Sequence, residues 1–344
     1  MRAAVLHAPK DLRIESVALP TLGPSDVEVR IEAGGICGSD LHYYFDGGFG
    51  TVRLKEPMIL GHEIAGTVTR VGAEVTSVTP GTRVAVNPSR PCGRCRYCQE
   101  GRQNHCLDMR FYGSAMRFPH VQGGFREMLV CDAAQAVPVA PTMSAAQAAF
   151  AEPFAVCLHA VNRAGALLGK RVLVTGAGPI GALTVIAARR AGALEIVATD
   201  VAGAPLAAAR KVGADQAINV TEQDALMRYG ADKGHFDVMF EASGNAAALA
   251  GGLGVVRPTG IVVQIGIAGG EMTLPMNLVV AKEIELRGTF RFHEEFALAV
   301  ALIGSGLVDV MPLLTETVPL SDARAAFELA ADRSRAMKVQ LAFT

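Results

Sequence analysis

Short runs of hydrophobic residues, separated by turn residues, fill residues 1 to about 150. The runs AAVLHAP, LRIESVALP and DVEVRIEAGGICGSD are rich in Val and Ile and are bounded by Pro and Gly. Runs of this kind are typical of β-strands, and many of them in succession favour a barrel-like sheet. This part of the chain is therefore predicted to be a β-rich domain.

The pattern changes near residue 142. Residues 142–167 are rich in Ala and carry apolar residues at helical spacing, which predicts a helix. The next segment, KRVLVTGAGPIGALTVIAARRAGALEIVATD, predicts a strand, a glycine turn, a helix and a second strand. FDVMFEASG and TGIVVQIGIAGG are continuous apolar runs, as in strands buried on both faces of a parallel sheet. We predict a doubly wound α/β unit here.

The C-terminal part predicts two helices, in residues 292–310 and 321–333, and a closing strand in VQLAFT. We expect this tail to return to the first domain. The predicted organisation is a β-rich domain of residues 1–154 and 290–344, interrupted by an α/β domain of residues 155–289.

The composition of the 344 residues argues against several classes of protein. Half of the residues are hydrophobic, 19% are charged and the formal net charge is -1, which favours large buried cores over a nucleic-acid-binding surface. The uncharged segment 172–188 is broken by glycines and Pro179 and is short for a membrane span. The N-terminal residues lack the apolar core of a signal peptide. We expect a cytoplasmic protein that binds neither nucleic acid nor a membrane.

Residues 176–181 read GAGPIG and fit the pattern G-x-G-x-x-G. The pattern alone is weak, but here it follows the strand RVLVT and opens a helix, and Asp200 ends the next strand 19 residues after Gly181. The start of that helix favours phosphate, and Asp200 is expected to accept hydrogen bonds from ribose hydroxyls and to repel a 2′-phosphate. The segment therefore predicts a Rossmann domain that prefers NAD to NADP, the alternative being a structural turn with a surface aspartate.

Four of the seven cysteines follow the spacing C-x2-C-x2-C-x7-C: Cys92, Cys95, Cys98 and Cys106. Four thiolates on one short loop match a tetrahedral zinc site with no open position, so the site is expected to be structural. An iron–sulfur cluster is the chemical alternative, and disulfides are disfavoured in the expected compartment.

A second group of candidate ligands is scattered along the chain: Cys37 in GGICGSDLH, His62 and Glu63 in LGHEIAG, and Glu152 in AEPFAV. Taken singly, a Cys or His in an apolar segment is more often part of a core than a metal ligand. Periodicity does not bring these residues together, so the residues alone leave both interpretations open.

Taken together, the motifs identify a resemblance. GICGSDLH, GHE with GTVTRVG after it, the cysteine quartet and the glycine turn have the order and spacing found in the zinc-containing medium-chain alcohol and polyol dehydrogenases. The chain resembles that family over essentially its whole length. The resemblance implies an α/β fold class with a GroES-like catalytic domain and a Rossmann domain, two zinc ions per chain, and NAD or NADP as cofactor. A non-catalytic relative would be expected to lose ligands, and a zinc-finger nucleic-acid binder would need a basic surface around the quartet.

The resemblance also implies a catalytic set. Its members are Cys37, Ser39, His42, His62, Glu63 and Glu152. Cys37 and His62 match zinc ligands, and the two glutamates complete the site, one on the metal and the other on a bound water. Ser39 and His42 match a proton relay that leads to solvent.

A further set of residues matches the cofactor contacts of the family: Gly176, Gly178, Pro179, Ile180, Gly181, Asp200, Gly266, Phe290 and Arg291. The chain departs from the pattern at Pro205, where relatives often carry a basic residue near the adenosine ribose. That departure puts strict NAD preference in doubt.

Within the family the chain is similar to the sorbitol dehydrogenase branch and, inside it, to the L-idonate 5-dehydrogenases. The likeness rests on residues 108–125 and on FAEPFAVCLHA, LRGTFRF and AMKVQLAF. It implies oxidation of L-idonate to 5-keto-D-gluconate, with sorbitol, xylitol and threonine dehydrogenases as alternatives. The carboxylate of a sugar acid calls for a cation, for which Arg117 and Arg291 are candidates and His120 is a weaker one. Tyr43 is expected to line the substrate cleft, and a homotetramer or homodimer is expected.

Overall fold

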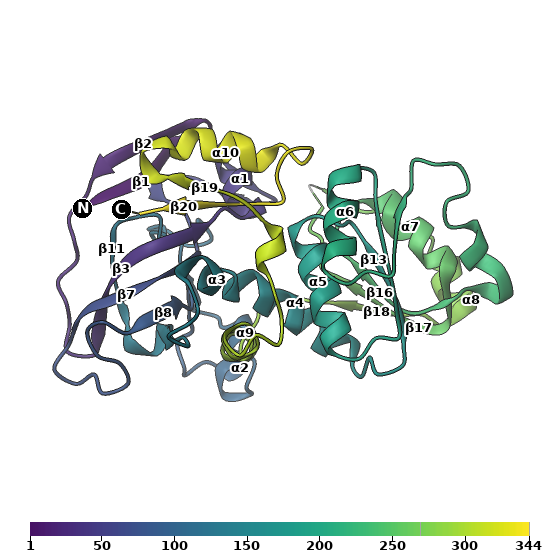
Figure 1. The fold of residues 1–344 in the computed structure, drawn as a ribbon, viewed down its shortest axis with the longest axis horizontal. Helices are drawn as coiled ribbons and strands as arrows, with labels where there is room; N and C mark the ends of the chain where they lie inside the picture. The colour runs from purple at the N-terminus through teal and green to yellow at the C-terminus, as the bar shows by residue number, and fades with distance from the viewer. Residues whose placement is uncertain (269, 344) are drawn as a thin grey trace.

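The computed structural model describes residues 1–268 and 270–343 and contains two lobes (Figure 1). The first lobe contains the N-terminal strands together with the last strand and helix of the chain, drawn in purple and yellow, and the second contains the middle of the chain in teal and green. Helix α4 (Ala151–Ala164) runs between the lobes. Gly269 in TGIVVQIGIAGG and Thr344 at the end of the predicted closing strand lie outside the described residues.

A seven-stranded sheet forms the centre of the first lobe, in the order β12-β8-β7-β3-β20-β19, with β11 also paired to β3. Its strands are β3 (Asp26–Gly35), β7 (Glu63–Val71), β8 (Arg83–Val86), β11 (Met128–Asp132), β12 (Ala136–Pro138), β19 (Leu314–Pro319) and β20 (Lys338–Ala342). On one edge β3 pairs with β7, and on the other edge β11 pairs with the first half of β3 and β20 with its end. Val27, Val29 and Ile31 of β3 are fully buried, as the strand period of two requires. The predicted β-rich domain is therefore present.

Smaller elements complete the first lobe. A three-stranded sheet has the order β2-β1-β6, and two further pairs join β4 to β5 and β9 to β10. Their bounds are β1 (Arg2–Ala8), β2 (Asp11–Ser16), β4 (Gly48–Phe49), β5 (Val52–Arg53), β6 (Met58–Ile59), β9 (Ser89–Arg90) and β10 (Arg110–Phe111). The helices of this lobe are α1 (Gly38–Asp46), α2 (Arg96–Gln99), α3 (Ala145–Ala149) and α10 (Ala323–Ala331).

The second lobe is a parallel sheet with the strand order β15-β14-β13-β16-β17-β18. Its strands are β13 (Arg171–Thr175), β14 (Glu195–Asp200), β15 (Gln216–Asn219), β16 (Phe236–Glu241), β17 (Val256–Gln264) and β18 (Glu285–Gly288). The helices that cover it include α5 (Pro179–Arg190), α6 (Gly203–Lys211), α7 (Ala246–Val255) and α8 (Met276–Lys282) (Figure 1). Because the sheet is covered, the strands at its centre are apolar on both faces, and the doubly wound unit predicted from the continuous apolar runs is confirmed.

Two expectations from the pattern need correction. The single helix predicted in residues 142–167 is two helices, because α3 ends at Ala149, α4 begins at Ala151 and Phe150 caps both. The helix predicted in residues 292–310 is shorter: α9 (Glu295–Gly304) stops before Gly306, which has a φ of 70°.

The closing strand pairs with β3 and β19, so the tail does return to the first sheet. The domain boundaries at residues 154/155 and 289/290 stay a prediction, and the first of them falls inside α4. In the described ranges, no helix combines the length and apolar character that crossing a bilayer requires.

Candidate active site

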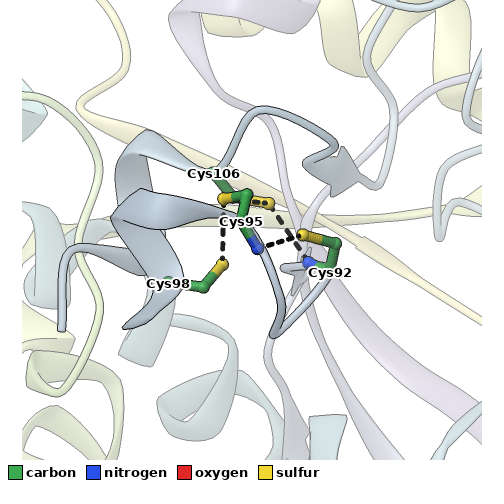
Figure 2. A group of neighbouring side chains, drawn as sticks. All are labelled: Cys92, Cys95, Cys98 and Cys106. Atoms are coloured by element: carbon green, nitrogen blue, oxygen red, sulfur yellow. Dashed lines mark hydrogen bonds between the residues drawn. The ribbon is translucent and has the colours of Figure 1, made fainter. Parts of the chain in front are cut away.

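The four cysteines of the quartet converge on one point (Figure 2). They lie on residues 92–106, which we call the cysteine loop, and their four Sγ atoms are within 4.8 Å of one another. The Sγ of Cys95 is 3.6 Å from that of Cys98 and 4.0 Å from that of Cys106. All four are free thiols rather than disulfides.

Backbone N–H groups turn toward the sulfur atoms of this loop. The N–H of Cys92 donates to Cys106 Sγ at 3.1 Å and that of Asp108 to the same sulfur at 3.3 Å. Hydrogen bonds from the backbone, first from Leu107, lower the pKa of Cys95 to about 6. Donors of this kind stabilise a thiolate at Cys95, whereas burial raises the pKa of Cys98 to about 12. The loop has the all-sulfur ligand set of a closed metal site.

The second cluster forms where two neighbouring strands end. Gly35 at the end of β3 pairs directly with Glu63 at the start of β7. Cys37, two residues after Gly35, therefore meets His62, the residue before Glu63. The ligand atoms of Cys37, His62 and Glu63 lie within 4.8 Å of one another. Sheet register thus assembles residues that their sequence positions leave apart.

Gly35 itself is required for this arrangement. A Cβ built on it would lie 2.0 Å from Glu63 Oε2, a separation that no real pair of atoms sustains. Any larger residue at this position would therefore displace the carboxylate from the site.

Asp40, which the sequence analysis did not single out, holds the two loops together. It is fully buried, and its Oδ2 accepts the N–H of Cys37 at 3.0 Å while its Oδ1 accepts the N–H of Gly61 at 3.1 Å. The same Oδ1 lies 3.7 Å from His62 Nδ1. This separation is longer than a hydrogen bond, and His62 Nδ1 has no hydrogen-bond partner among the described residues. The only sequence signal was its place in CGSD, where it also serves as N3 of the capping box of α1.

Lys338 is the second residue that the sequence analysis missed. It lies in β20, is buried, and its Nζ is 2.6 Å from Glu63 Oε1 and 2.5 Å from Oε2. Nζ also donates to the carbonyl of Ile36 at 3.0 Å. The charge of Glu63 is thus balanced inside the protein. No short-range pattern could have shown this contact, because 275 positions separate the two residues.

Glu152, in the first turn of α4, is buried without such a partner. Within residues 1–268 and 270–343 its carboxylate forms no hydrogen bond or ion pair. Burial raises the pKa of Glu152 to about 8, although nearby His62 favours the charged form. A buried carboxylate in this state needs either a proton or a cation.

The predicted relay and cleft residues lie on α1. Ser39 is in the first turn and is partly exposed, and His42 is exposed with its Nδ1 3.4 Å from Asp46 Oδ2. Tyr43 is 2% exposed and its hydroxyl accepts the N–H of Ala115 at 3.0 Å. Ser39 and His42 are three residues apart on α1, and the relay and cleft roles of Ser39, His42 and Tyr43 stay predictions.

The glycine turn follows β13 as expected. Gly176 has a φ of 84°, and a Cβ there would lie 2.7 Å from the N of Ser243; at Gly181 it would lie 1.8 Å from the carbonyl O of Gly176. Gly178 is different, because a Cβ there would meet nothing within 4 Å. Gly178 is the N-cap of α5, with Pro179 at the first helical position. The protein itself does not require glycine at 178, so the space above it is open for a ligand.

Asp200 ends β14 beside this turn. Its Oδ2 accepts the N–H of Ala177 at 2.8 Å, and its Oδ1 accepts those of Val201 and Ala202 at 2.8 and 3.0 Å. Pro205 is buried in α6, and the basic residues of that helix, Arg210 and Lys211, lie in its last turn. The first turn of α6 therefore offers no cation to a 2′-phosphate.

A hollow of about 350 Å³ is lined by both candidate arginines, by Cys106 and by Phe111. Arg117 is paired with Asp108, and its Nε donates to the carbonyl of Met109 at 2.8 Å. His120, the weaker candidate, uses both ring nitrogens, on the carbonyl of Arg117 and the N–H of Lys55. Neither side chain has an uncommitted positive charge to offer a ligand.

Arg291 differs from Arg117 in its partners. Its guanidinium lies 4.1 Å from the ring centroid of Phe111, whose ring is 5.4 Å from that of His62. Within the described residues it forms no ion pair with a carboxylate. Burial lowers the pKa of Arg291 to about 10. Its Nη2 donates to Met116 Sδ at 3.1 Å, and the negative charge of Glu152 partly offsets the effect of burial on its pKa. A partly buried guanidinium without a carboxylate in an ion pair favours binding of an anion.

Comparison with known proteins places this geometry in a family. Residues 23–141 match the alcohol dehydrogenase GroES-like domain, and residues 179–305 match the zinc-binding dehydrogenase family. The chain is 45% identical over 315 residues to the L-idonate 5-dehydrogenase (NAD(P)(+)) of Escherichia coli K12, covering 92% of this chain and 91% of the relative. The chain belongs to the zinc-binding alcohol dehydrogenases.

Two further comparisons agree with this family. The sorbitol dehydrogenase of Bacillus subtilis is 37% identical, covering 96% of this chain and 93% of the relative. The crystal structure of L-idonate 5-dehydrogenase from Escherichia coli superposes with a TM-score of 0.94 at 42% identity, covering 99% of this chain and 98% of the other. The predicted fold class, a GroES-like domain combined with a Rossmann domain, is confirmed.

The chain is an NAD(P)-dependent zinc alcohol dehydrogenase, so it is expected to contain ligand sets that suit zinc. Both clusters contain such ligands. The cysteine loop offers four sulfur atoms, and the second cluster offers sulfur, nitrogen and oxygen. Burial, reinforced by Glu63, raises the pKa of Cys37 to about 11, so a thiolate there needs a cation. The ligand atoms of Cys37, His62 and Glu63 are close enough to hold a divalent ion, and Glu152 lies outside this group.

Proposed function

We propose that this dehydrogenase oxidises a secondary alcohol of a sugar acid reversibly, with L-idonate and 5-keto-D-gluconate as its substrate pair. The observation that carries the proposal is Arg291, which has no carboxylate partner in an ion pair, lines the hollow and lies over Phe111, the ring that neighbours His62. A sugar acid carries its carboxylate several carbons from the reacting hydroxyl, and a guanidinium near the catalytic cluster can bind that carboxylate in a fork. The 45% identity to an L-idonate 5-dehydrogenase supports the same substrate.

Cys37, His62 and a carboxylate would hold the catalytic zinc. Because Glu63 is already paired with Lys338, we assign Glu152 as the carboxylate that faces the ion and Glu63 as a positioning group behind it. When bound, the zinc lowers the pKa of an alcohol and NAD accepts a hydride. Cys92, Cys95, Cys98 and Cys106 would hold a second, structural zinc.

The protein moves the proton that the alcohol loses. We assign the first step to the Ser39 hydroxyl and the exit to the exposed imidazole of His42, a general acid–base group. Arg291 orients the other end of the substrate.

The glycine turn would bind the pyrophosphate of the cofactor, with Gly178 left open for its approach and Gly266 packed against Gly244 behind it. Asp200 would accept the adenosine ribose hydroxyls, and no cation in the first turn of α6 compensates a 2′-phosphate. We therefore propose that NAD is preferred over NADP.

We also propose that the protein forms a homodimer or homotetramer. β18 is an edge strand of the six-stranded sheet and exposes Leu286. Met276 and Val280 of α8 are exposed at 52% and 73%. An edge strand with apolar neighbours is a ready pairing surface for a second copy.

The test is a comparison of substrates and arginines. We expect wild-type protein to turn over L-idonate and 5-keto-D-gluconate with NAD(H) in preference to sorbitol, measured by the absorbance of NADH. Arg291→Ala should lower kcat/KM for L-idonate by about 30-fold or more, with a much smaller effect on sorbitol, because a desolvated charge pair is lost. Arg117→Ala, the matched control, should change both little.

Sorbitol is the second candidate, favoured by the 37% identity to a sorbitol dehydrogenase. Good turnover of sorbitol without turnover of L-idonate or 5-keto-D-gluconate would replace the first proposal by the second. Equal losses on both substrates in Arg291→Ala would remove the carboxylate-binding role.

A further inference from the structure

The chain that carries Arg291 passes between the lobes without a helix or strand of its own. It leaves β18 at Gly288 and enters α9 at Glu295. The N–H of Thr289 donates to the carbonyl of Gln264 at 3.2 Å, which fixes the start of this crossing segment. After Arg291, Phe292 is buried and its ring lies 5.6 Å from that of Phe296.

Arg291 itself has a φ of 55°. Residues other than glycine rarely adopt this left-handed conformation, and they hold it only where neighbouring contacts determine it. Phe290, the residue before Arg291, therefore needs a fixed position, because a rotation of the backbone at Phe290 would turn the guanidinium away from Phe111.

The cysteine loop supplies that fixed position through Asn104. Asn104 is buried in the short 3-10 helix Gln103–His105, directly before Cys106. Its Nδ2 donates to the carbonyl of Phe290 at 3.0 Å. The ring of His105 stacks on that of Phe290, with centroids 6.1 Å apart and planes 25° apart.

We propose that Asn104 is a positioning residue for Arg291, so that the cysteine loop takes part in substrate recognition as well as in stability. The amide holds the carbonyl of Phe290, the held carbonyl fixes the conformation of Arg291, and the guanidinium stays over Phe111 in the hollow. This inference rests on the proposed function in one respect, namely that Arg291 contacts the substrate.

The test is a double-mutant cycle on the full-length protein. Asn104→Ala should lower kcat/KM for L-idonate by about tenfold, mainly through KM, since the arginine is displaced and the chemistry is not. In an Arg291→Ala background the same change should cost less than about twofold, because there is no guanidinium left to position. Zinc content and Tm are measured alongside and should stay close to wild type.

Gln103→Ala is the matched control, since it lies in the same turn and its side chain forms no hydrogen bond within the described residues. It should leave KM unchanged. Asn104→Ser is the second variant, for use if Asn104→Ala does not fold, and it should show the same coupling to Arg291.

Equal losses in both backgrounds, or a loss of activity that follows zinc content and Tm, would overturn the positioning role. Failure of the proposed function has a different signature, namely wild-type protein that prefers sorbitol. The cycle is then measured on sorbitol, where coupling between Asn104 and Arg291 sustains the inference and additivity overturns it.

Discussion

The two metal clusters of this dehydrogenase are built in opposite ways. The cysteine loop gathers four like ligands from 15 consecutive residues, 92–106, and backbone N–H groups help to hold the charge of its sulfur atoms. The second cluster gathers unlike ligands, Cys37 after β3 and His62 and Glu63 at the start of β7, and balances charge with buried side chains, as Lys338 does for Glu63. The comparison teaches that a closed, structural site can be local, whereas an active site that must leave room for substrate depends on tertiary structure.

The largest expected effect is a loss of activity when a ligand of the second cluster is removed. Cys37→Ala should lower kcat by about a thousandfold or more, because the ion that polarises the alcohol loses a ligand. Tm should change little. NADH absorbance gives the rate, and Cys131→Ala, which removes a buried thiol away from both clusters, serves as control. Residual activity within tenfold of wild type would contradict the assignment.

The next effect is a loss of stability when a ligand of the cysteine loop is removed. Cys95→Ser should reduce the zinc content from two ions to one and lower the free energy of unfolding by more than about 4 kcal/mol, as expected where a structural metal is lost. Metal analysis and denaturant unfolding measure both. Protein that keeps wild-type stability with one zinc would show that the loop does not brace the fold.

A smaller effect tests the charge balance in the catalytic cluster. Lys338→Met leaves the buried Glu63 carboxylate unpaired and should destabilise the protein by about 3 kcal/mol. The double variant Lys338→Met with Glu63→Gln should recover much of that loss in chemical denaturation. If the second change brings no recovery, the pair does not carry the effect.

The smallest effect concerns Glu295, which ends the crossing segment beside the cysteine loop. Burial alone would raise the pKa of Glu295, but hydrogen bonds from His159, the N–H of His293 and Asn162 lower it to about 2. The folded state therefore binds this proton less tightly than the unfolded state, so the stabilisation is complete above the ordinary pKa near 4.5 and is lost as the pH falls from there toward 2.

Glu295→Gln should accordingly cost about 1–2 kcal/mol at pH 7 and nearly nothing near pH 2. Unfolding by urea across this pH range measures the difference. A cost that does not change with pH would assign the effect to packing rather than to charge.

The sequence predicted the parts of this molecule that depend on neighbours along the chain. The cysteine spacing and the glycine turn are local, and the apolar runs identified the parallel sheet. Cys37, His62 and Glu63 came together only through the β3–β7 register, so family resemblance had to join them.

The sequence did not predict which charged side chains form ion pairs in the folded protein. Lys338 pairs with a residue 275 positions away, and Arg117 is neutralised by Asp108 while Arg291 is not. The break at Phe150 was also missed, because the apolar spacing continues through it and α4 begins there without a side-chain cap.

The position of Lys338 has a consequence for how the protein is made. A ribosome finishes the cysteine loop long before it reaches β20, so the quartet can take up its ion while most of the chain is still unsynthesised. Glu63 waits for its partner until 275 further residues have been added. We therefore expect nascent chains stalled before β20 to hold one zinc ion and no activity, with the catalytic ion entering last.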